Sequence, residues 1–134
     1  TFPETDDACG LIFKLDLIIN QLAAKELSIA RFYIKTEKWI PAINRLKIIV
    51  EDYDETIFVE EALHRLVEIY YRIGLENEAK AAAVLLGYNY NSSEWYVRSY
   101  KVLNKDYKPP KITKGNEEGG LIRRTIKKLL FIND

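Results

Sequence analysis

Side chains that commonly perform chemistry are sparse in this sequence of 134 residues. His64 is the only histidine and Cys9 the only cysteine, and no glycine-rich phosphate loop, serine nucleophile elbow or zinc-ligand spacing occurs. We expect His64 to be hydrogen-bonded or solvent-facing. Cys9 is expected to be a small buried apolar residue, because Asp6 and Asp7 beside it would disfavour a thiolate. The sequence therefore predicts a protein that is not an enzyme, with no catalytic residue, metal or cofactor.

The overall composition excludes two further classes of function. The 20 Lys and Arg residues equal the 20 Asp and Glu residues, so the formal net charge is zero, which argues against a nucleic-acid-binding module that works by bulk charge. Apolar residues make up 48% of the chain and charged residues 30%, as in a folded globular protein. Charged residues interrupt every apolar run before the roughly 20 residues that a membrane-spanning helix needs.

A basic group near the end of the sequence could bind a partner. Residues 121–132 read as an amphipathic helix with apolar residues on one face and four cations on the other. The cations are Arg123, Arg124, Lys127 and Lys128. Such a helix could lie on an anionic membrane surface, dock into a partner's groove, or fold back on its own chain.

A short phrase that repeats along the chain indicates how the remaining side chains are positioned. Residues 2–5, 53–56 and 90–93 each read as aromatic, turn residue, polar residue and hydroxyl residue, which is a turn followed by a helix cap. The second and third copies lie 37 residues apart, close to the 34-residue period of tetratricopeptide repeats. The fold class predicted is all-α: a right-handed tetratricopeptide solenoid of antiparallel helix pairs.

Apolar periodicity and turn residues set the expected elements. A long helix should run from about Thr5 to Lys35, followed by helices from Pro41 to the turn at Tyr53, at 57–73 and 76–88, and from Ser93 to Asn104, with Gly74 and Gly87 as left-handed helix ends. The expected organisation is repeats at 1–104, a linker containing Pro and Gly at 105–120, and the amphipathic helix at 121–132. Since residues 2–5 read as the end of a repeat, we expect a further repeat before residue 1.

The first helix of each pair should line a concave face, where residues off the packing stripe would face outward. The candidates are Arg31, Lys35, Glu61, His64, Glu68, Tyr71 and Arg72. Their mixture of charge and aromatic area suits contact with a peptide or loop. An ordinary solvated face is the alternative for each of them.

Several blocks carry a resemblance to a known family. Residues 21–33 (QLAAKELSIARFY), 39–45 (WIPAINR), 50–56 (VEDYDET) and 61–63 (EAL) resemble the BamD, or ComL, family of outer-membrane assembly lipoproteins, and residues 85–90 and 93–96 resemble its alphaproteobacterial branch. The likeness covers about residues 1–103, the C-terminal half of that family's five-repeat solenoid. Asp54 and Asn91 depart from the Pro usual after the aromatic residue.

The resemblance implies a function that composition and spacing do not. A member would be a scaffold subunit of the machinery that inserts β-barrel proteins, held at the periplasmic face of the outer membrane by a lipid anchor absent from this sequence. Its partners would be the POTRA domain of BamA, other subunits of the machinery, and unfolded outer-membrane proteins engaged mainly by the family's N-terminal half. A generic tetratricopeptide adaptor that binds a peptide in its concave groove is the alternative.

One contact is implied residue by residue. Asn44 and Arg45 match the family's Asn-Arg pair, whose Arg is implicated in a salt bridge to the POTRA domain. The planar guanidinium of Arg suits a bidentate grip on a carboxylate. The alternative is a helix Arg paired with Glu26, Glu51 or nothing.

Overall fold

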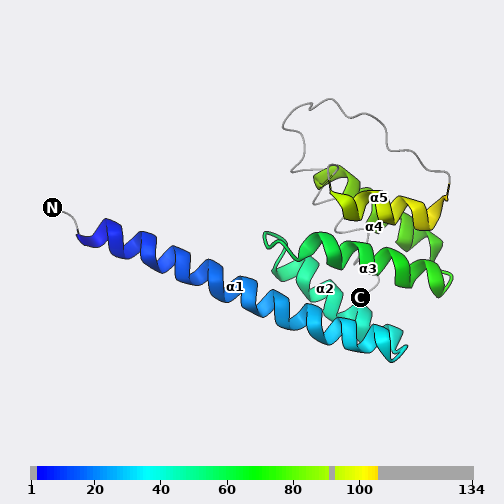
Figure 1. Ribbon diagram of the computed structural model, residues 1–134, viewed down its shortest axis with the longest axis horizontal. Coiled ribbons are helices and arrows are strands. Elements are labelled where there is room, and N and C mark those ends of the chain that lie inside the picture. The colour runs from blue at the N-terminus through cyan, green and yellow to red at the C-terminus, as the bar shows by residue number, and fades with distance from the viewer. Residues whose placement is uncertain (1–2, 91–92, 106–134) are drawn as a thin grey trace. The chain divides into compact units, whose positions relative to one another are not determined.

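The computed structural model describes residues 3–90 and 93–105, and this part of the chain consists of helices and short connections. The helices are α1 (Pro3–Lys35), α2 (Trp39–Asp52), α3 (Val59–Arg72), α4 (Glu76–Asn89) and α5 (Glu94–Leu103) (Figure 1). The all-α, tetratricopeptide-like fold class is confirmed, and the helix bounds lie within about two residues of those predicted. None of the described helices combines the length and hydropathy needed to cross a membrane.

The chain divides into two compact units, residues 1–59 and 60–134. In the first, α2 turns back along the C-terminal half of α1 (Figure 1). Small and large residues of both helices are buried in this unit; they include Ala23, Leu27 and Ala30 of α1 and Ala42, Leu46 and Ile49 of α2. Small residues at this crossing allow the helix backbones to approach closely.

The second unit consists of α3, α4 and α5. Its core is built from the apolar stripe of α3 and the alanine- and leucine-rich side of α4, and includes Leu63, Leu66, Ala82, Ala83 and Leu86. The helix α5 packs on α4, where the ring of Tyr96 lies over Gly87. Ser93 accepts a hydrogen bond from the Trp95 backbone N–H and caps α5, as the repeated phrase predicted.

The other turn predictions have mixed outcomes. Gly74 has a left-handed φ of 88° and ends α3, as expected. The prediction for Gly87 is wrong, because α4 continues through it to Asn89 and the absence of a side chain there makes room for Tyr96. The cap expected at Thr5 is also wrong, since α1 already begins at Pro3, a residue suited to a first helical turn. The hydroxyl of Thr56 donates to the Tyr53 carbonyl at 2.7 Å and closes its own turn.

Candidate functional site: a partner-binding surface

The side chain of Arg45 lies at the junction of α1 and α2. Leu46 beside it is fully buried against α1, which leaves Arg45 half-buried at the edge of the contact and Asn44 exposed. The Arg45 Nη1 donates to Glu26 Oε2 of α1 at 3.0 Å, with 39% of the Arg45 side chain and 16% of the Glu26 side chain exposed. Of the pairings left open by the sequence, the structure therefore shows the one with Glu26.

This geometry leaves Arg45 able to bind a second acceptor. The ion pair with Glu26 uses one terminal nitrogen of Arg45, whereas a guanidinium carries five N–H donors in a rigid plane. A carboxylate approaching the exposed edge would meet an arginine whose position is already held by Glu26. The pair can thus present a fixed cationic fork on the surface of α2.

The expected concave-face residues do not all reach the surface. Arg31 and Lys35 on α1, and Tyr71 and Arg72 on α3, are exposed, and Glu68 is half-buried. The prediction that Glu61 and His64 face outward is wrong, because they are only 8% and 3% exposed. Their positions on α3 lie on the side that packs within the protein.

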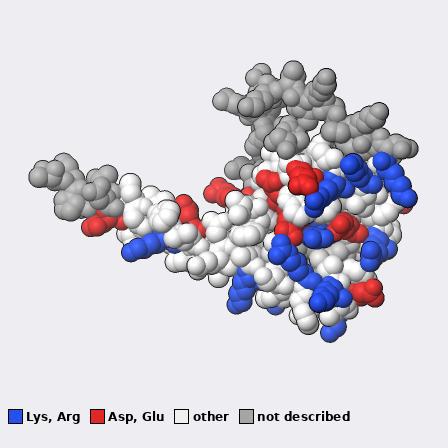
Figure 2. Space-filling view, viewed as in Figure 1, with Lys and Arg blue, Asp and Glu red and all other residues white. Residues whose placement is uncertain are grey.

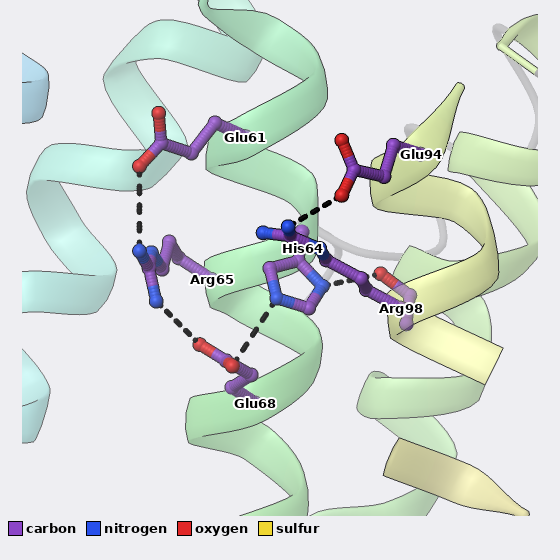
Figure 3. Close-up of polar contacts among 7 residues, drawn as sticks. Glu61, His64, Arg65, Glu68, Glu94 and Arg98 are labelled. Atoms are coloured by element: carbon purple, nitrogen blue, oxygen red, sulfur yellow. Dashed lines mark hydrogen bonds and ion pairs between the residues drawn. The ribbon is translucent and has the colours of Figure 1, made fainter. Parts of the chain in front are cut away.

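His64 is the centre of a polar network that joins α3 to α5 (Figure 3). Its Nε2 lies 3.1 Å from Glu68 Oε1 and its Nδ1 lies 2.8 Å from the hydroxyl oxygen of Ser99, which is fully buried. A carboxylate only accepts, so Nε2 donates to Glu68 and, in the neutral ring, Nδ1 accepts from Ser99. The prediction of a hydrogen-bonded His64 is confirmed.

Arg65 extends the network along α3. It contacts Glu68 Oε2 at 3.0 Å and Glu61 Oε1 at 3.5 Å. Burial would raise the pKa of Glu68, but the hydrogen bond and charge of His64, and then those of Arg65, bring it below its ordinary value of 4.5. The Glu68 carboxylate is therefore stabilised by its two neighbours, whereas the buried Nε of Arg65 has no hydrogen-bond partner among the described residues.

Trp95 closes the network from α5. Its ring lies 5.2 Å from that of His64 between centroids, and the guanidinium of Arg98 lies 4.9 Å from its centroid. Arg98 is in turn paired with Glu94 (Figure 3). Trp95 thus contacts His64 of α3 from α5, and the Ser99 side chain beneath this contact is fully buried. Sequence reasoning missed Ser99, although its three-residue spacing from the buried Tyr96 places it on the packed face of α5.

Cys9 and the four cations near the end of the sequence are the remaining residues that the sequence singled out. Cys9 lies within α1 as predicted, but it is exposed and not buried. The four cations Arg123, Arg124, Lys127 and Lys128 lie outside the described residues. Acidic and basic side chains are interspersed over the visible face of the described helices (Figure 2). Among the described residues, no three His, Cys, Asp or Glu side chains lie close enough together to hold a metal ion.

Comparison with known proteins gives this surface a context. The family model described as YfiO, outer membrane lipoprotein, matches residues 1–85. Outer membrane protein assembly factor BamD of Caulobacter vibrioides is 43% identical over 103 residues, which cover 77% of this chain and 34% of that protein. BamD of Rickettsia prowazekii is 43% identical over 106 residues, 79% of this chain and 42% of that protein. The resemblance predicted from the sequence is confirmed.

More distant relatives carry the same name. BamD of Vibrio cholerae is 32% identical over 87 residues, which cover 65% of this chain and 35% of that protein. The chain therefore spans between a third and a little over two-fifths of the length of these relatives. No solved structure matches it significantly.

Proposed function

The chain belongs to the YfiO family of outer-membrane lipoproteins, and from this premise we propose that it is a non-catalytic scaffold segment of the machinery that assembles outer-membrane β-barrel proteins. Its relatives are named as assembly factors of that kind. The segment would act at the periplasmic face of the outer membrane, in a protein held there by a lipid anchor. Unfolded barrel substrates would be engaged mainly by other parts of the longer protein.

The segment's own task in this proposal is to dock the POTRA region of BamA through Asn44 and Arg45. The observation that carries the proposal is the arrangement of Arg45: its side chain is 39% exposed, its Nη1 is held by Glu26 at 3.0 Å, and the neighbouring residue Asn44 is exposed. A carboxylate on the partner would complete the coordination of the free edge of the guanidinium. Positioning by Glu26 reduces the conformational entropy that Arg45 loses on binding.

Charge reversal at this pair separates docking from folding. We expect Arg45→Glu to reduce co-purification with BamA strongly, because it removes the cation and sets two carboxylates side by side. The double variant Glu26→Arg/Arg45→Glu restores the ion pair inside the protein but not the cation at position 45. Its circular dichroism and unfolding midpoint should return toward wild type while BamA capture stays low.

Two results would contradict the proposed contact. Full capture by Arg45→Glu would remove Arg45 from the interface. Recovery of capture in the double variant would show that the ion pair acts only by stabilising α1 against α2.

The alternative of a peptide-binding adaptor receives less support from the same geometry. Two of its candidate groove residues, Glu61 and His64, are buried and bonded to other residues of the protein. They cannot contact a peptide without breaking the network that joins α3 to α5. No observation favours this function over docking.

A further inference from the structure

The end of the first unit where α1 turns into α2 (Figure 1) combines exposed apolar side chains with cations. Phe32 near the end of α1 is 59% exposed, and Ile40 at the start of α2 is 64% exposed. Arg31 and Lys35 on α1 and Lys38 in the turn are exposed as well. We call these five residues the α1–α2 tip.

The tip lies apart from the Arg45–Glu26 pair. Lys35 follows Glu26 by nine residues, and at about 100° per residue this spacing places it half a turn around α1. Ile40 precedes Arg45 by five residues, which is about 140° around α2. Phe32 and Lys35 are three residues apart and so lie on the same side of α1. The tip and the ion pair therefore present separate surfaces of the helix pair.

Hydrogen bonds within the turn satisfy the end of α1. Three carbonyls in its last turn accept from the backbone N–H groups of Thr36, Glu37 and Lys38 at 2.8–3.1 Å. The Thr36 hydroxyl also donates to the Phe32 carbonyl, at 3.0 Å. Pro41, in the first turn of α2, has no N–H that needs an acceptor. The tip can therefore approach an apolar phase without these carbonyls losing their partners.

Charge distinguishes the tip from the other end of α2. Residues 31–40 contain three cations and one acid, Glu37, whereas residues 51–55 contain four acids and no cation. Ile57, which is 78% exposed, follows that acidic stretch. Two exposed isoleucines of the same unit thus lie in opposite electrostatic surroundings. An anionic surface would attract the tip and repel the region of Ile57.

We propose that the α1–α2 tip binds the surface of an anionic phospholipid membrane. Phe32 and Ile40 enter the boundary between the headgroups and the acyl chains. The cations beside them stay at the level of the lipid phosphates, with the apolar stems of the lysines lying along the boundary. Binding of this kind is reversible and grows stronger with the fraction of anionic lipid.

The composition of the tip favours lipid over a covering protein. A helix packed on Phe32 and Ile40 would also bury the cations beside them and would have to supply a partner for each. Two of the three cations are lysines, whose compact charge on a flexible stem suits mobile headgroups, whereas bidentate recognition of a carboxylate favours Arg. The inference rests on the proposed function only in that the latter places a phospholipid surface nearby.

A fluorescent label at position 40 tests the contact in the full chain. Cys9→Ser removes the native thiol, and Ile40→Cys or Ile57→Cys then carries the environment-sensitive dye NBD. With vesicles of phosphatidylglycerol and phosphatidylcholine, we expect the label at position 40 to brighten and to shift to shorter wavelength, while the label at position 57 stays unchanged. Vesicles of phosphatidylcholine alone should bind at least about tenfold more weakly.

Charge reversal distinguishes the tip from the other cations of the chain. We expect Lys35→Glu/Lys38→Glu to weaken binding to the anionic vesicles at least about tenfold. The matched control is Lys101→Glu/Lys105→Glu, which makes the same change in net charge at two exposed lysines of the second unit and should bind nearly as the wild type does. Both proteins keep the four cations of residues 121–132, and circular dichroism shows whether they keep their helices.

Three results would overturn the lipid contact: no response of the label at position 40 to the anionic vesicles, equal responses at positions 40 and 57, or equal weakening by the two charge variants. A response to the purified POTRA region of BamA in place of the vesicles would identify the tip as a protein contact and would equally overturn it. Loss of vesicle binding beside intact BamA binding contradicts the lipid contact alone, and the reverse result contradicts the proposed docking alone.

Discussion

At the scale of single residues, His64 shows how one buried histidine is satisfied without catalytic use. Its two ring nitrogens reach Glu68 on the same helix and Ser99 on α5, and its ring faces Trp95. A buried polar side chain left without partners would cost about 1–3 kcal/mol. The network therefore fixes α5 against α3 at a defined rotation, which apolar contacts alone specify less strictly.

The lowered pKa of Glu68 makes this network sensitive to acid. A carboxyl group whose pKa is lower in the folded than in the unfolded protein stabilises the fold. This contribution is complete above the pKa of the group in the unfolded protein, and it is lost as the pH falls through the pKa of the group in the folded protein. We expect the urea midpoint to drop as pH is lowered from about 5 through 4 and below, with a smaller drop in Glu68→Gln. Identical pH profiles for the two proteins would show that ionisation of Glu68 does not contribute to stability.

At the scale of the elements, Gly87 sets how closely α4 and α5 approach. A Cβ at this position would contact the Tyr96 ring, and α4 is already helical there. We expect Gly87→Ala to lower the free energy of unfolding by about 1–3 kcal/mol, because overpacking outweighs the gain in helix propensity. Urea denaturation measures the change.

Gly10→Ala is the matched control for Gly87→Ala. It also lies inside a helix, α1, but in the part of the chain that the structure describes no atom outside its own helical backbone and chain neighbours lies within 4 Å of the position a Cβ would take. Gly10→Ala should therefore leave stability unchanged or raise it by up to about 1 kcal/mol. Destabilisation by Gly10→Ala, or none by Gly87→Ala, would contradict the packing explanation.

The sequence predicted the helices well and their packed sides less well, for physical reasons seen at particular residues. Gly74 and Ser93 act locally, through a left-handed turn and a cap, so their roles are readable from neighbouring residues. In contrast, the role of Gly87 depends on packing against Tyr96, nine residues later, and that of His64 depends on a hydrogen bond with Ser99, thirty-five residues later. Such contacts depend on which side of each helix packs on its neighbour. Helical periodicity alone does not determine this for the charged residues of α3.

At the scale of the whole molecule, two compact helical units carry different features. The first contains the Arg45–Glu26 pair, and the second contains the His64 network. The opposite charges of the chain cancel in total; the Arg45–Glu26 pair joins α1 to α2, whereas the ion pairs of His64 and Arg65 lie within α3 and that of Arg98 within α5.

Docking of this segment to the POTRA region of BamA, as we propose, can be measured directly. The most direct measurement is isothermal titration calorimetry, which gives the affinity of the chain for the purified POTRA region of BamA from the same organism. The titration is repeated with the Arg45→Glu variant. The account predicts saturable binding by the wild-type chain and affinity at least about tenfold weaker for the variant. An absence of binding by the folded wild-type chain, or equal affinity of the two proteins, would contradict it.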